Sequence, residues 1–84
     1  MSFRQVSSIV KVKVKFTNLS DKHINRAKGT AIIYDENHNE IGFQENYVIK
    51  STEGGLKPNA IARHNFIVTV NGKGSMADIE YKIL

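Results

Sequence analysis

The stretch "IVKVKVKFTN", residues 9–18, decides the fold, because apolar and polar side chains alternate along it from Val10 onward. The apolar set comprises Val10, Val12, Val14 and Phe16, and the charged set comprises Lys11, Lys13 and Lys15. A period of two is typical of a β-strand that turns one face to the core and the other to water. The stretch therefore predicts a strand over about residues 8–17.

The same period recurs along the rest of the chain, where β-branched and aromatic residues are enriched. Further strands are expected at about residues 26–35, 41–49, 61–70 and 76–84, with a short one at about 3–6. The polar run "DENHNE", residues 35–40, predicts a hairpin, and the Asn71-Gly72 dipeptide predicts another through a type I′ turn. No segment has helical periodicity.

These strands predict one all-β domain that occupies residues 1–84. A chain of 84 residues buries about 60% of its unfolded surface, which supports one modest core. Strands of this length favour a small antiparallel β-sandwich, and a five-stranded β-barrel stays open as the alternative. The core is expected to comprise Val10, Val12, Val14, Phe16, Ile33, Phe43, Phe66, Val68, Ile79 and Tyr81.

Composition excludes several kinds of chemistry. The chain has no cysteine, which rules out disulfides, zinc–thiolate sites, iron–sulfur clusters and cysteine nucleophiles. Its longest uncharged apolar run, residues 31–34, is far too short to span a membrane as a helix. The start "MSFRQVSS" lacks the apolar region of a signal peptide, so the chain is expected to be cytoplasmic if complete and extracytoplasmic if excised from a longer secreted protein.

The net charge of +4 is concentrated in the first third of the chain. The row of Lys11, Lys13 and Lys15 spans about 13 Å of strand and has two interpretations, the solvated face of an amphipathic strand or a patch that binds a polyanion. Nucleic-acid modules of this size interleave exposed aromatic rings with their cations, and only Phe3 and Tyr34 fall outside the apolar sets here. We therefore expect mainly a solvated face.

The remaining polar residues do not form a recognisable catalytic or metal-binding pattern. Asp35, Asn37 and Asn39 match the first three ligand positions of an EF-hand loop, but the glycine and the final glutamate of that loop are absent. A polar turn is therefore expected, with calcium held between loops of the sandwich as the alternative for these three residues. The three histidines have no paired ligand spacing. Neither a nucleophile elbow nor a phosphate-binding glycine loop occurs. We expect no enzyme activity, no catalytic or metal-binding residue and no cofactor.

Three segments share a recognisable order of features, namely "VKFTNLSDKHI" (residues 14–24), "AIIYDENHNEIG" (31–42) and "GLKPNAIARHNFIV" (55–68). Together they resemble the FxLYD domain, an immunoglobulin-like sandwich of bacterial extracytoplasmic and lipid-anchored proteins. Within them Ile33, Tyr34 and Asp35 match the naming leucine, tyrosine and aspartate of the family. Ala31 replaces the phenylalanine, and Asn59 replaces the glycine after proline.

The resemblance implies an immunoglobulin-like fold and a non-enzymatic module, and it brings no catalytic or ligand residues with it. The function that the resemblance implies is therefore an interaction or spacer module of a bacterial, extracytoplasmic protein, which binds a protein partner, or a second copy, through an edge strand or the loops. Glu45, Asn46 and Lys82 are the positions at which charged substitutions would test edge pairing. The alternative is a small basic β-domain that binds nucleic acid or another polyanion through Lys11, Lys13 and Lys15.

Overall fold

The computed structural model describes residues 2–84, which form six strands and one short 3₁₀ turn. The elements are β1 (Ser2–Val6), β2 (Ile9–Thr17), β3 (Ala27–Tyr34), β4 (Glu40–Ile49), η1 (Ser51–Glu53), β5 (Ile61–Thr69) and β6 (Met76–Ile83). Every strand expected from the sequence is present, with its ends within one residue of the expected position. The alternation of apolar and polar residues therefore locates the strands of this chain correctly.

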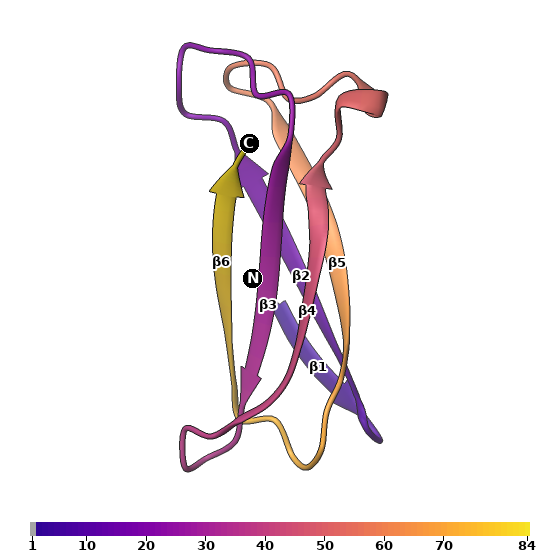
Figure 1. Cartoon of the computed structure of the whole chain (residues 1–84). Helices are drawn as coiled ribbons and strands as arrows, with labels where there is room; N and C mark the ends of the chain where they lie inside the picture. Colours follow the sequence, from indigo (N-terminus) through magenta and orange to yellow (C-terminus); the bar gives the residue numbers. More distant parts are fainter. Residues whose placement is uncertain (1) are drawn as a thin grey trace.

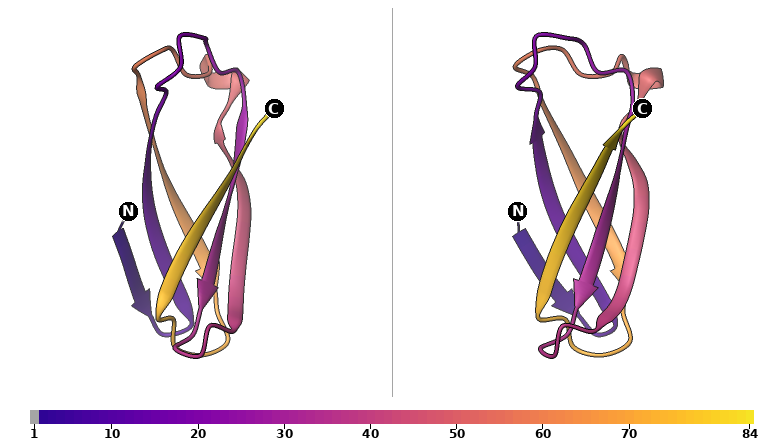
Figure 2. Two further views of the ribbon diagram at one scale, coloured as in Figure 1. Left: turned by 90° about the vertical axis from the view of Figure 1, so that its left-hand side faces the viewer. Right: turned by 60° about the vertical axis from the view of Figure 1, so that its left-hand side comes forward.

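The strands form two antiparallel sheets of three strands each, with orders β1-β2-β5 and β4-β3-β6 (Figure 1). The sheets stack face to face in a molecule of about 40 × 21 × 19 Å. They do not close into one barrel, so the expected β-sandwich is confirmed and the five-stranded barrel is not. Figure 2 shows the two layers from the side, with the long loops 18–26 and 50–60 together at the upper end.

The core lies between the inward faces of β2, β3 and β5. The side chains at its centre are completely buried, namely Phe66, Ile33, Val10, Val12 and Val68. Phe16 and Ile79, which were also expected in the core, pack against its rim and are partly buried. Burial of the large apolar side chains is the main source of stability in a domain of this size.

The two sheets approach closely at Gly29, the inward position of β3 beside Phe66. A methyl group at this position would lie 2.9 Å from Cγ1 of Val48 and 3.0 Å from Cζ of Phe66. Both distances are shorter than an ordinary van der Waals contact. The absence of a side chain at Gly29 therefore allows the phenyl ring of Phe66 to fill the centre of the sandwich.

Phe43, expected in the core, is 63% exposed and lies on the outer face of β4 opposite Ile32. Two irregularities in the β3–β4 register change which β4 side chains point inward, and a shift of one residue reverses the face of every side chain. The side chain of Val48 packs inward beside Gly29. The expectation for Phe43 was wrong because the alternation in β4 suits either face.

Tyr81, also expected in the core, is 53% exposed although its ring packs edge-on against Phe16 at 4.3 Å. Its side chain does point toward the other sheet, so the predicted direction holds while the predicted burial does not. The ring stays exposed because β6 is an edge strand, which pairs with β3 on one side and with no strand of residues 2–84 on the other.

The hairpin expected at Asn71-Gly72 does not form, because β5 and β6 lie in different sheets. Residues 70–75 cross instead from one sheet to the other at the lower end of the sandwich (Figure 1). Gly72 has a φ of 126°, and the Asn71 amide donates to the Ile41 carbonyl at 3.0 Å. The dipeptide marks a turn correctly, but a turn signal does not say which strands it joins.

The "DENHNE" run does form the expected hairpin between β3 and β4.

Residues 2–84 contain no helix that is long and apolar enough to span a membrane.

Candidate functional site

The predicted lysine row lies on the outer face of the β1-β2-β5 sheet. Lys11, Lys13 and Lys15 are exposed, and the strand register adds Arg4 beside Lys11 and Arg63 beside Lys15. We call these five residues the basic face. None of the three strands contains an aspartate or glutamate, so the strands contribute no negative charge to the face.

Like charges stand directly opposite each other on the basic face, at Arg4–Lys11 and at Lys15–Arg63. Such cross-strand pairs are destabilising, and an anion would relieve them. The ion pairs of the described residues lie elsewhere, between Lys28 and Glu45 at 3.5 Å and between Lys50 and Glu53 at 3.6 Å. The face is therefore a surface of uncompensated positive charge rather than one side of an ion-pair network.

The aromatic residues that could assist nucleic-acid binding are not on the basic face. Phe3 pairs with the inward Val12, and its ring lies at the inner side of the sandwich near Gly74. Tyr34 lies at the end of β3 in the other sheet. The apolar groups that do share the basic face are aliphatic and more than 40% exposed, namely Val6, Ile9, Ile61 and Ile67. Among the residues described, this face offers no aromatic ring on which a base could stack.

The Asp35 turn uses its polar groups internally. Oδ1 of Asp35 accepts hydrogen bonds from the amides of Asn37 and Asn39, both at 2.9 Å, and the Asp35 amide donates to the Asn39 carbonyl. The hydrogen bond from the Asn39 amide is the main cause that lowers the pKa of Asp35. The carboxylate thus closes a polar turn, as expected. In residues 2–84 no three His, Asp or Glu side chains converge as a metal site would require.

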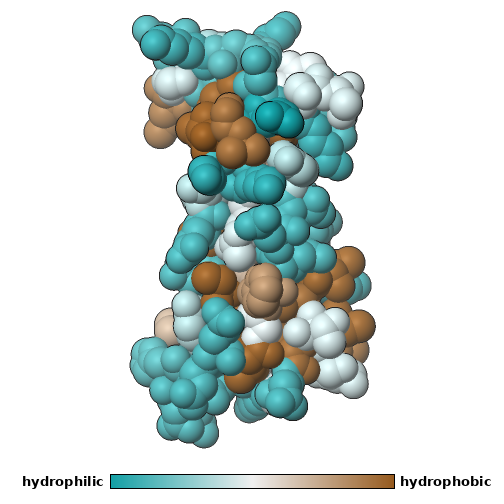
Figure 3. Space-filling model, in the orientation of Figure 1, coloured by the Kyte–Doolittle hydropathy of each residue, from teal (hydrophilic) through white to brown (hydrophobic). Residues whose placement is uncertain are grey.

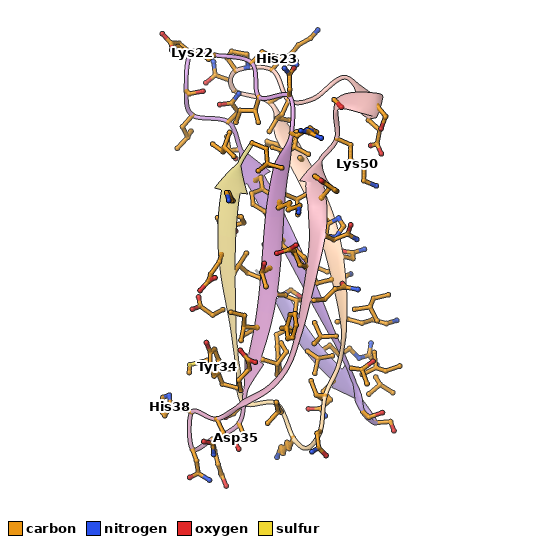
Figure 4. All side chains as sticks on the ribbon, in the orientation of Figure 1. Lys22, His23, Tyr34, Asp35, His38 and Lys50 are labelled. Atoms are coloured by element: carbon orange, nitrogen blue, oxygen red, sulfur yellow. The ribbon has the colours of Figure 1, made fainter. Side chains whose placement is uncertain are left out.

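The three histidines are far apart. Figure 4 shows His23 in the upper loops and His38 at the opposite end of the molecule, and His64 lies in β5. The His64 ring packs edge-on against Phe66 at 4.6 Å, and its Nε2 is buried without a hydrogen-bond partner in the described chain. Burial, and to a lesser extent the charge of Lys50, lower the pKa of His64 below 6.5. His64 is a boundary residue of the core.

Asn18 begins the tripeptide Asn18-Leu19-Ser20, which fits the Asn-X-Ser pattern of N-glycosylation, and its side chain is buried with an exposed fraction of 3% for the residue. Its Nδ2 donates to the carbonyls of Lys22 at 2.8 Å and Leu56 at 3.1 Å, while its Oδ1 accepts from the amide and hydroxyl of Ser20. Asn18 therefore ties the loop after β2 to the loop before β5. A buried amide with both functions engaged is a structural residue and not a glycan acceptor.

The feature that the sequence did not locate is the free edge of the β4-β3-β6 sheet. The β4 edge, where the sequence placed Glu45 and Asn46, is partly covered: Gln44 Oε1 accepts a hydrogen bond from the Ile67 amide of β5 at 2.9 Å. On the other side of the sheet, β6 has an edge of eight residues that no strand of the described chain pairs with. Of the residues expected to test edge pairing, Lys82 alone lies on it.

The backbone groups that point outward from β6 can be identified. The Leu84 amide donates to the Arg26 carbonyl at 3.0 Å, and the β3–β6 register continues without a shift to Met76. Because antiparallel partners alternate between bonded and non-bonded pairs, the even-numbered residues of β6 bond to β3. The amides and carbonyls of the odd-numbered residues therefore face the free edge, namely those of Ala77, Ile79, Tyr81 and Ile83.

Apolar side chains accompany this edge. Ile83 is 67% exposed and Tyr81 is 53% exposed, and Leu84, which directly follows β6, is exposed as well. Figure 3 shows apolar surface gathered near the C-terminal end of β6. We call residues 76–84 with their outward backbone groups the β6 edge.

Compared with known proteins, the chain matches no family model, no curated protein and no solved structure.

Proposed function

We propose that this protein is a non-enzymatic interaction module that binds a protein partner by accepting an extended strand along the β6 edge. The observation that carries the proposal is a strand of eight residues without an outer neighbour in the described chain, whose inward side chains Tyr81 and Ile83 stay more than half exposed. An added strand would satisfy the outward backbone groups and cover those side chains. Strand addition is a common way for β-proteins to bind peptides and proteins.

The β6 edge lacks three of the features by which proteins prevent edge pairing, although its outer face carries the charged Asp78, Glu80 and Lys82. Free edges are commonly very short, interrupted by proline, bent by a bulge or lined with charged side chains, lysine above all. β6 contains no proline, and its register with β3 is regular from Met76 to Ile83. By contrast β1, one of the two edges of the other sheet, has five residues and lies beside only the lower half of β2 (Figure 2). The second edge, β5, lies against β4, and its Ile67 amide donates to Gln44 Oε1. β6 is therefore the better docking strand.

The strand order supports an immunoglobulin-like identity for the module. In immunoglobulin sandwiches strands A, B and E share one sheet, and strands C, F and G share the other. β1, β2 and β5 would correspond to A, B and E, whereas β3 and β6 would correspond to C and F with β4 as an additional strand beside C. The β6 edge is then the position of strand G, which the described residues do not fill.

The three sequence segments that resemble the FxLYD domain extend the proposal to a bacterial, extracytoplasmic protein. Two local features of the third segment suit the tight turn of that family: Leu56 is buried, and Asn59 has a φ of 63°. Glycine adopts this conformation freely and asparagine tolerates it, so Asn59 can stand where the family has glycine.

A labelled nonapeptide of alternating threonine and valine tests strand acceptance directly. We expect it to bind the wild-type protein and to lose binding to Ile83→Pro, because this substitution removes an outward amide while the bonds to β3 remain. Ile83→Val is the matched control, which keeps both the amide and an apolar side chain and should keep binding. A peptide that binds wild type and Ile83→Pro equally, or binds neither, contradicts docking on the β6 edge.

A second candidate function is favoured by the basic face, whose like charges stand opposite each other without counter-charges from their own strands. We propose that it binds a linear polyanion through Arg4, Arg63 and the three lysines. Five phosphate or sulfate contacts predict a log–log salt slope of about −3.5 to −4.5.

Heparin affinity measured across salt concentrations tests this candidate. Replacing Lys11, Lys13 and Lys15 together with glutamine should make the slope shallower by about 2 to 3. The control variant carries glutamine in place of three loop lysines, namely Lys22, Lys57 and Lys73. It has the same net charge as the first variant but should keep most of the salt slope. Equal effects of the two triple variants would show that net charge alone attracts the polymer.

A further inference from the structure

We propose that the strand accepted by the β6 edge is β6 of a second copy of this chain, antiparallel to the first and related by a two-fold axis at Tyr81. This inference rests on the proposed function, because it names the partner for the same edge. The result would be one continuous sheet of six strands, in the order β4-β3-β6-β6-β3-β4.

The outward backbone groups fit this arrangement. With the axis at Tyr81, the two copies of Tyr81 face each other, and Ile79 of each copy faces Ile83 of the other. All three are residues whose amide and carbonyl point away from β3. The Ile79 amide now donates to Oδ1 of its neighbour Asp78 at 3.0 Å, as expected of an amide that β3 does not bind. Each facing pair can exchange two hydrogen bonds, so the ladder forms without any change in the β3–β6 pairing.

Charge complementarity selects the register. On the outer face of the sheet Glu80 of each copy would stand opposite Lys82 of the other. Within one copy Lys82 stands opposite Lys28, a like charge, and Glu80 stands opposite Thr30. Neither Glu80 nor Lys82 takes part in an ion pair of the described residues. The second copy would supply to each the opposite charge that its own sheet does not.

Neighbouring registers are less favourable. An axis at Glu80 pairs Asp78 with Lys82 but places Glu80 opposite its own copy, and an axis at Lys82 places Lys82 opposite its own copy. An axis at Ile79 places Asp78 opposite Glu80. Like charges directly opposite each other destabilise a strand pair, and an axis nearer either end of β6 overlaps fewer of its residues. The axis at Tyr81 combines a long overlap with opposite charges.

The exposed apolar side chains fit the same register. The inward side of β6 carries Ile79, Tyr81 and Ile83, of which the last two are more than half exposed. In the pair, Ile83 of one copy would pack against Ile79 of the other, and the two tyrosine rings would lie side by side next to Phe16. The surface left open beside β6 would become the centre of the interface.

Charge reversals in two different variants test the proposal by sedimentation equilibrium. Glu80→Lys gives a chain with lysine at both positions 80 and 82, and Lys82→Glu gives a chain with glutamate at both. Each single variant should dimerise at least about tenfold more weakly than wild type, because two attractive pairs become repulsive. In an equimolar mixture every pair between positions 80 and 82 joins opposite charges, so a heterodimer should form with near wild-type affinity.

Two controls complete the experiment. Asp78→Lys makes the same charge change as Glu80→Lys on the same strand but opposite the uncharged side chain of Leu84, and it should dimerise nearly as wild type does. The double variant Glu80→Lys/Lys82→Glu should regain the homodimer. Circular dichroism of every variant checks that the sandwich is intact.

The outcomes separate this inference from the proposed function. A wild-type protein that stays monomeric at millimolar concentration while it binds the threonine–valine peptide overturns the second copy as partner and leaves strand acceptance standing. If each single variant dimerises more weakly than wild type but the equimolar mixture forms no tight heterodimer, the register at Tyr81 is overturned. A protein that neither dimerises nor binds the peptide overturns both.

Discussion

Asn18 offers the sharpest test of how the upper loops are held together. Its buried amide makes four hydrogen bonds, two donated to the Lys22 and Leu56 carbonyls and two accepted from Ser20. Asn18→Ala removes all four. The cost is moderated because the Leu56 carbonyl keeps the Ile24 amide as a donor at 2.9 Å. In addition the Ser20 hydroxyl, whose oxygen lies 3.1 Å from the Lys22 carbonyl, can donate to that carbonyl the proton it now donates to Asn18.

At about 1 kcal/mol net for each bond, with partial compensation, Asn18→Ala should lower the free energy of unfolding by about 2 to 3 kcal/mol. Asn18→Asp should cost more than alanine at pH 7, because a carboxylate oxygen would then face the two carbonyl oxygens that the Nδ2 group now contacts. In a domain of this size a loss of about 2 kcal/mol corresponds to a Tm lower by about 8 to 16 °C.

Urea unfolding of wild type, Asn18→Ala and Asn18→Asp, monitored by circular dichroism, measures these differences. Ser20→Ala is the matched control, since it removes the hydroxyl contact and leaves both Nδ2 bonds, and it should cost less than about 1 kcal/mol. An Asn18→Ala variant within about 0.5 kcal/mol of wild type, or an aspartate variant more stable than alanine, would refute the reasoning about this amide.

Further predictions concern the core and the pH dependence of stability. Phe66→Ala should cost about 3 to 5 kcal/mol while Phe43→Thr costs less than about 1 kcal/mol, and urea titrations with the reverse order would contradict the observed register of β4. Gly29→Ala should destabilise by about 1 to 3 kcal/mol through contacts with Val48 and Phe66, which thermal unfolding tests, and a more stable variant would show that the sheets can move apart. His64 should make the fold less stable as pH falls below 6.5, because its lowered pKa means that the unfolded chain binds the proton more readily. His64→Leu should therefore reduce the dependence of the unfolding free energy on pH in this range. An unchanged pH dependence would mean that other groups cause it.

The alternation in β2 was sufficient to predict its strand, its buried face and its lysine row, because each face of β2 is dominated by one kind of side chain. β4 could not be predicted as well. Both of its faces carry apolar and polar residues, and two irregularities in its pairing with β3 decide which face points inward. Periodicity identifies a strand, but only the neighbouring strand fixes the direction of its side chains when the two faces are alike.

The candidate sites show the same division. The lysine row is visible in the sequence, but Arg4 and Arg63 join it through the pairing of β1 and β5 with β2, which the sequence pattern does not give. The β6 edge is a property of strand order, and no residue of β6 marks it as an edge. The Asn71-Gly72 turn even favours the wrong neighbour, because it predicts a β5–β6 hairpin that the two-sheet arrangement does not contain.

Amide hydrogen exchange along β6, measured by NMR at increasing protein concentration, tests the free edge most directly. The amides of Asp78, Glu80 and Lys82, which bond to β3, should exchange slowly at every concentration. Those of Ile79, Tyr81 and Ile83 should exchange fast in dilute solution and slow down as the concentration rises. Odd-numbered amides that are protected in the dilute monomer, or even-numbered ones that are not, would contradict the assignment of β6 as the open edge of the sandwich.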